Sequence, residues 1–183
     1  VSWSTLVGDD GSGGGAFNAA VHTFADYLAD TAGNTNQWRR IYRSIFGFDA
    51  SAIDDDDVKN SAILSLYGDT ADEGESAAAG NIYTSAPASN TNCVAGDFDS
   101  LGTARQSDTN ILFQSWNTSG YNDWAFNSTG MGNISFTDVS FFGGREAVHD
   151  APNSAPTWVA GDVPYANINQ ADQTGTSKDP KLV

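Results

Sequence analysis

Three acidic side chains lie at short spacings around a turn glycine. They are Asp69, Asp72 and Glu75, in the segment Asp-Thr-Ala-Asp-Glu-Gly-Glu at 69–75. Calcium in proteins takes about six to eight oxygen ligands from carboxylates and loop carbonyls. This segment is therefore a candidate calcium site, and the run of four aspartates at 54–57 is a second. Neither has the spacing of an EF-hand loop, and a solvated acidic loop that keeps the protein soluble is the alternative for both.

Aromatic side chains in turn-rich segments offer a different chemistry, the binding of sugars. An exposed aromatic ring can stack on the apolar face of a pyranose. Trp116 begins a turn that Tyr121 ends, and Trp158 follows a loop that contains two prolines. These three residues are the candidates for glycan binding. The alternative is that their rings pack in the core or under loops, as most aromatic side chains do.

Catalytic residue types form no recognisable constellation. His149 precedes Asp150, but neighbouring residues of a strand point to opposite faces, so adjacency does not make a catalytic pair. Cys93 has no basic neighbour that would lower its pKa. A glycosidase needs two carboxyl groups about 5–10 Å apart, and the sequence singles out no pair among its acids. We therefore expect no catalysis, and a polysaccharide hydrolase or lyase domain is the remaining enzymatic alternative.

The charge balance narrows the classes of partner. Twenty-three acidic residues against eight Lys and Arg give a formal net charge of −15. Such a charge repels the phosphate backbone, so we expect no binding of nucleic acid. No apolar run approaches the roughly 20 residues that span a bilayer, so we expect no membrane insertion.

The composition favours strands and turns over helices. Asp, Asn, Gly, Ser and Thr make up 88 of the 183 residues, whereas Glu, Lys, Arg and Met make up 12. The first group favours turns and caps, and the second favours helix interiors. A length of 183 residues fits one domain with its own core. The sequence therefore predicts a single all-β domain over residues 1–183.

The spacing of apolar residues predicts the individual elements. Phe17, Val21, Phe24 and Leu28 share one helical face, so a helix is expected within 16–29. Residues 1–37 as a whole are expected to be an irregular, partly helical insertion before a sandwich core at 38–183. A period of two predicts strands over the remaining chain, at 38–48, 58–67, 81–85, 111–116, 121–127, 133–136, 139–145, 164–170 and 180–183.

Three arginines are concentrated on the first of these strands. Arg39 and Arg43 point to one face and Arg40 to the other, if the strand is regular. In so acidic a chain they are expected to pair with carboxylates such as Asp49 rather than to bind a ligand.

Several segments resemble, in order, those of a recurring jelly-roll domain family. The basic strand Trp38–Asp49 is followed by Ser-Ala-Ile-Leu-Ser-Leu at 61–66, and further similarity covers 82–91, 121–123, 127–135 and 171–183. The family is similar to carbohydrate-binding modules and occurs in phage and metagenomic virion proteins and in microbial surface proteins. The resemblance implies a jelly-roll β-sandwich of two antiparallel sheets, and it transfers no catalytic residue.

Together these features predict a non-catalytic extracellular protein on a virion, a fibre or a cell-surface appendage. The expected role is a structural subunit that assembles with copies of itself, through strand pairing at the chain ends 1–10 or 180–183. The alternative is a carbohydrate-binding or adhesion module. Calcium is the one cofactor considered. Asn117, Asn127 and Asn133 begin N-glycosylation sequons, which matter only in a host that glycosylates.

Overall fold

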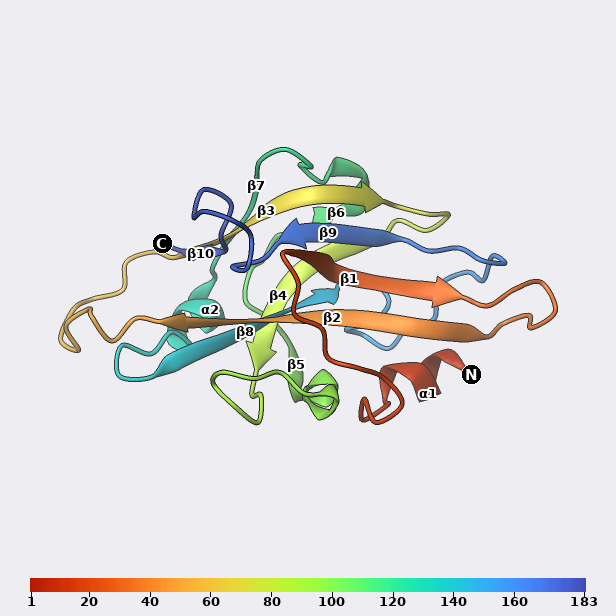
Figure 1. Ribbon diagram of the computed structural model, residues 1–183, viewed down its shortest axis with the longest axis horizontal. Coiled ribbons are helices and arrows are strands. Elements are labelled where there is room, and N and C mark those ends of the chain that lie inside the picture. The colour runs from red at the N-terminus through yellow and green to blue at the C-terminus, as the bar shows by residue number, and fades with distance from the viewer.

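The fold was described from a computed structural model that covers residues Val1–Val183. The chain is mostly β, with ten strands, two α-helices of five residues and two short 3₁₀ helices. The strands build one curled antiparallel sheet, whose long central strands run across the width of Figure 1. The elements are, in order, α1 Trp3–Val7, β1 Val21–Ala29, β2 Trp38–Asp49, β3 Ile63–Asp72, β4 Ala79–Ser85, η1 Ala95–Ser100, β5 Leu101–Arg105, β6 Ile111–Leu112, η2 Phe113–Ser115, β7 Tyr121–Ala125, α2 Ser128–Gly132, β8 Val139–Glu146, β9 Tyr165–Asn169 and β10 Lys181–Leu182.

Every pairing between strands is antiparallel. The order along the sheet is β10-β3-β9-β1-β2-β8-β4-β5, with β6 paired to β4 and β7 paired to β3. The hydrogen bonds thus connect all ten strands into one sheet, eight of them along this path and β6 and β7 as branches from it. This confirms the expected all-β class.

The helix expected within 16–29 is wrong, because residues 21–29 form strand β1 in the middle of the sheet. This strand pairs with β2 on one side and with β9 on the other. Residues from Phe24 to Tyr27 are all buried, so the side chains on both faces of the strand are covered. In such a strand the apolar residues lose their alternation, and a helical spacing can arise by coincidence. The irregular N-terminal segment therefore ends at residue 20 rather than at 37.

The other strand predictions hold where alternation is strong. The strand expected at 38–48 is β2, and its partner strand β8 begins at the predicted Val139. The strand expected from Val58 begins only at Ile63, and Val58 itself is 78% exposed. Residues 133–136 form no strand, and β5 at 101–105 was not anticipated.

The main core lies inside the curl of the sheet. Fifteen buried residues form one cluster, contributed mostly by the strands. Its aromatic centre is Phe24, whose ring stacks on Trp124 with centroids 5.3 Å apart and lies at the same distance from Trp116. This packing joins β1 to β7 and to the segment after η2, which are distant in sequence.

A second, smaller core lies where β1 ends and β2 begins. Helix α1 supplies Trp3 and Val7, which pack with Tyr27, Trp38 and Ile41. The side chain of Ser2 caps this short helix by accepting a hydrogen bond from the Thr5 amide. The helix therefore fixes the start of the N-terminal segment against β2.

A buried ion network ties four parts of the chain together. The carboxylate of Asp150 accepts from Arg43 in β2 at 2.6 Å and from Arg145 in β8 at 2.9 Å. All three side chains are at most 5% exposed. Arg43 also donates to the carbonyl oxygens of Val7 and Phe98, so the network holds both α1 and η1 against the sheet.

Neither α-helix has the length and apolar character needed to cross a membrane.

Candidate functional site

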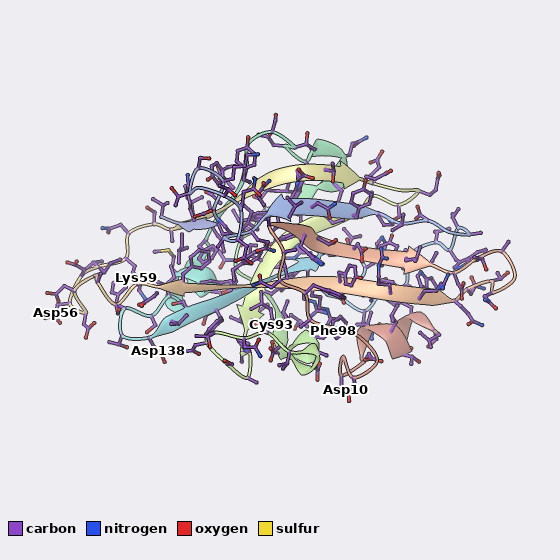
Figure 2. All side chains as sticks on the ribbon, viewed as in Figure 1. Asp10, Asp56, Lys59, Cys93, Phe98 and Asp138 are labelled. Carbon is purple, nitrogen blue, oxygen red and sulfur yellow. The ribbon has the colours of Figure 1, made fainter.

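A groove with a volume of about 1100 Å³ runs along β2. One wall is the N-terminal segment between α1 and β1, which passes in front of β2 in Figure 1. The second wall is formed by residues 87–98, the loop before η1 and the start of η1. In Figure 2, Asp10 marks the N-terminal segment, and Cys93 and Phe98 mark the second wall. Ligand pockets in proteins commonly have volumes of roughly 300–1,000 Å³, so the groove has room for a ligand larger than one sugar ring.

The N-terminal wall is positioned by one glycine and two capped turns. Gly11 has a φ of 79°, and a Cβ there would lie 1.9 Å from the carbonyl oxygen of Ala95. Only glycine permits this conformation and this close approach. The carboxylates of Asp9 and Asp10 accept from the amides of Gly11 and Ser12. The two turns shape the N-terminal segment, and the close approach of Gly11 to Ala95 places it against the second wall.

The second wall is held by a buried carboxylate. Asp97 is 2% exposed, and its two oxygens accept from the amides of Ala88 and Val94, each at 2.8 Å. Between these amides the loop presents small polar side chains that line the groove, namely Ser89, Asn90, Thr91 and Asn92. Their hydroxyl and amide groups can both donate and accept hydrogen bonds.

An aromatic cluster occupies the groove between these walls. Phe17 is 59% exposed, and its ring stacks on His22 with centroids 5.5 Å apart and an interplanar angle of 20°. Tyr42 meets both rings edge-on, at 6.1 Å from Phe17 and 5.8 Å from His22. The Nδ1 atom of His22 accepts from the amide of Thr23, which fixes the orientation of the imidazole ring. Phe17 thus presents an open apolar ring on a fixed support.

The arginines of β2 approach the same groove, and each has an acidic partner. Arg40 donates to Asp26 at 2.6 Å, and its guanidinium lies 4.7 Å from the centre of the Tyr42 ring. Arg39 lies at the surface with its Nε atom 3.8 Å from Asp30. The expected pairing of these arginines with carboxylates is confirmed, although the partners are Asp26, Asp30 and Asp150 rather than Asp49.

Asp26 is buried beside this cluster at 2% exposure. Burial raises the pKa of its carboxyl group, and the hydrogen bonds from Arg40 and from the Tyr42 amide oppose that rise. Arg40 is thus the main group that stabilises the ionised carboxylate of Asp26. Asp26 lies behind the groove rather than among its lining residues.

None of the three aromatic residues predicted for glycan binding lines the groove. Trp116 is 6% exposed in the main core, and its Nε1 donates to the Asn167 carbonyl oxygen. Trp158 packs on the second core and donates to the Gln37 carbonyl oxygen. Tyr121 lies in β7, where Lys181 covers its ring at 4.1 Å. The structure gives Trp116 no exposed ring with which to stack on a sugar.

The predicted calcium ligands are also not brought together. Asp72 accepts from the Gly74 amide within the turn, and the Glu75 amide donates to the distant Asp162, so backbone amides rather than a shared cation organise the segment 69–75. Nowhere do three or more His, Cys, Asp or Glu side chains gather in a way that could hold a metal ion. The calcium site stays a prediction without support from this geometry.

Phe17 is the site residue that the sequence interpretation missed. Its spacing from Val21 assigned it to a buried helix face, although it lies two positions after the glycine-rich segment 8–15. A large apolar residue that follows such a segment is poorly placed to reach a core. That context was the signal that could have marked it as a surface ring.

The groove is therefore interpreted from its own geometry. Comparisons with known protein families, with curated proteins and with solved structures found no match to this chain.

Proposed function

We propose that this protein is a non-catalytic extracellular domain that binds a glycan in the groove along β2. The proposal keeps the jelly-roll interpretation of the sequence for the curled sheet, in which β1, β2 and β8 would form the floor of the site. It replaces the expected aromatic residues by the cluster in the groove. Adhesion to a polysaccharide surface is the corresponding biological role.

The exposed ring of Phe17 is the observation that carries the proposal. The phenyl ring is 59% exposed and stacks on His22, and Tyr42 meets both rings edge-on, so three aromatic rings gather in one groove. The groove combines this apolar platform with the hydroxyl and amide groups of Ser89–Asn92. Sugars need both, because a pyranose has an apolar face and a rim of hydroxyl groups.

Replacing Phe17 by alanine is expected to weaken glycan binding about 30-fold. The estimate follows from the loss of about 2 kcal/mol for an apolar ring that the ligand would cover. A panel of purified polysaccharides, screened by affinity electrophoresis and followed by calorimetry, measures the effect. Folding should be unchanged, because Phe17 lies outside both cores.

Val58→Ala is the matched control for that variant. Val58 is 78% exposed in the loop between β2 and β3 and does not line the groove, so its truncation should leave the affinity unchanged. Equal binding by F17A and the wild-type protein, or no binding to any polysaccharide in the panel, would contradict the proposed function.

A second candidate is the self-assembling subunit expected from the sequence, and one edge of the sheet favours it. Strand β7 pairs only with β3, so its other edge offers unpaired backbone groups to a neighbouring chain. The segments 1–10 and 180–183, which were expected to pair with other copies, form hydrogen bonds within the chain instead. The Val1 carbonyl oxygen accepts from the Trp38 amide, and Val183 exchanges two hydrogen bonds with Ile63.

Negative-stain electron microscopy and sedimentation of the concentrated protein test the assembly. Filaments or regular particles would support strand addition at β7. A single monomeric species at every concentration would contradict it, and it would leave the glycan-binding proposal untouched.

A further inference from the structure

We infer that the groove selects neutral glycans and rejects polyanionic ones. This inference rests on the proposed function and names the class of ligand for the same site. It comes from the pairing of charges around the groove.

Each arginine of the groove already has a carboxylate within 4 Å. Arg40 is bound to Asp26 at 2.6 Å, and Arg43 is bound to Asp150 at 2.6 Å and is only 3% exposed. Arg39 is the most exposed of the three at 58%, and Asp30 lies 3.8 Å from it. An anionic sugar entering the groove would therefore meet no arginine without an acidic partner, and it would have to compete with a carboxylate for each guanidinium.

The negative charge of the protein also disfavours the binding of an anionic sugar. Asp9 and Asp97 also line the groove, and the whole chain carries a net charge of −15. A uronate or sulfate group would be repelled on approach, most strongly at low ionic strength. A neutral sugar experiences no such repulsion.

Lysines without an acidic partner lie elsewhere on the molecule. Lys178 and Lys181 cover the rings of Tyr67 and Tyr121, at 5.0 and 4.1 Å from the ring centres. Lys59 donates to the Ile134 carbonyl oxygen and lies near the far left of Figure 2, away from Cys93 and Phe98 in the groove wall. None of the three lines the groove.

The uncharged groups of the groove suit sugar hydroxyls. Phe17 supplies the stacking face, and the polar side chains of Ser89–Asn92 in one wall and of Asn18 in the other supply donors and acceptors. These groups bind neutral hydroxyls without desolvating a charge. The expected ligand is thus a neutral hexose polymer.

The test compares neutral with anionic polysaccharides at two ionic strengths. Laminarin, galactomannan and dextran serve as neutral probes, and alginate, polygalacturonate and chondroitin sulfate as anionic ones. The wild-type protein should bind at least one neutral probe with an affinity that changes less than twofold between 20 and 300 mM NaCl (roughly 22 and 6 Å of screening length). It should bind no anionic probe.

Two variants remove the negative partners without altering the shape of the site. In Asp26→Asn the amide oxygen can still accept from the Tyr42 amide, while Arg40 loses its counter-charge. Asp30→Asn likewise frees Arg39 and serves if D26N does not fold. Either variant should gain measurable binding of polygalacturonate at 20 mM NaCl, where the wild-type protein shows none, and should lose it at 300 mM NaCl. Asp56→Asn makes the same charge change at the far left of Figure 2 and should not gain this binding.

The outcomes separate the two proposals. Neutral binding that depends on Phe17, with anionic binding gained only on D26N or D30N, supports both. Wild-type binding of an anionic probe that is lost on F17A overturns the selectivity and leaves the proposed function intact. Binding that is insensitive to F17A, or no binding to any probe, overturns the proposed function and the selectivity with it.

Discussion

Replacing Asp150 by alanine is expected to lower the free energy of unfolding by about 3–5 kcal/mol. Asp150 has no exposed side-chain surface and is shared by Arg43 and Arg145. Its removal would leave two buried guanidinium groups without their counter-charge, and breaking a buried pair in this way costs about that much. Urea unfolding followed by circular dichroism measures the change.

The control for this prediction is Asp56→Ala, in an exposed loop. Asp56 forms no ion pair, so its removal should change the stability by less than about 0.5 kcal/mol. A similar small loss for D150A would show that the Arg43–Asp150–Arg145 network does not hold the N-terminal segment and η1 on the sheet.

The same carboxylate gives stability a defined dependence on pH. Burial by itself raises the pKa of Asp150, but the hydrogen bonds and charges of Arg43 and Arg145 outweigh it and hold the pKa below the usual 3.8. A group with a lowered pKa in the folded state stabilises the protein fully above its unfolded pKa. That contribution is lost as the pH falls through the folded value. The stability difference between the wild-type protein and D150A should therefore be constant near neutral pH and shrink below about pH 4.

Replacing Trp116 by alanine is expected to cost about 3–5 kcal/mol of stability. The indole is 6% exposed, and it contacts Phe24, Phe113 and Trp124 with centroids 5.3–6.0 Å away. Thermal and urea unfolding of the purified variant measure the loss. Under conditions where W116A stays folded, its glycan affinity should equal that of the wild-type protein.

Trp158→Ala is the matched control, because Trp158 is half-buried at the margin of the second core. Its loss should cost less than half as much as that of Trp116. If W116A were stable and unable to bind glycan, Trp116 would be a binding residue, as its place in the sequence suggested.

The fold class followed from the sequence where one physical signal dominated. Alternation over Trp38–Asp49 located β2 to within one residue, although the buried positions along it (Trp38, Ile41, Ser44 and Phe46) do not repeat with a strict period of two. The signal failed in β1, where both faces are covered and the period disappears. It also failed at 133–136. No neighbouring strand lies there to form hydrogen bonds with this segment, so its strand propensity alone did not produce a strand.

The candidate site was less accessible from the sequence than the fold. Exposure of an aromatic ring depends on which distant segments cover it, and Trp116 is covered by β1 and β7. Phe17 lies in the segment between α1 and β1 and packs on His22 and Tyr42 of β1 and β2, and its ring stays 59% exposed. The pairing of Arg40 with Asp26 likewise depends on the register between β1 and β2, which places Asp26 opposite Tyr42.

An amide NMR titration tests the central claim most directly. The ligand is an oligosaccharide cut from the panel polysaccharide that the wild-type protein binds. Binding in the groove predicts that the largest shift changes fall in three places: in 16–23, around Tyr42, and in the loop 87–94. Shift changes centred on Tyr121 in β7 or on Trp158, with the groove signals unmoved, would contradict the account.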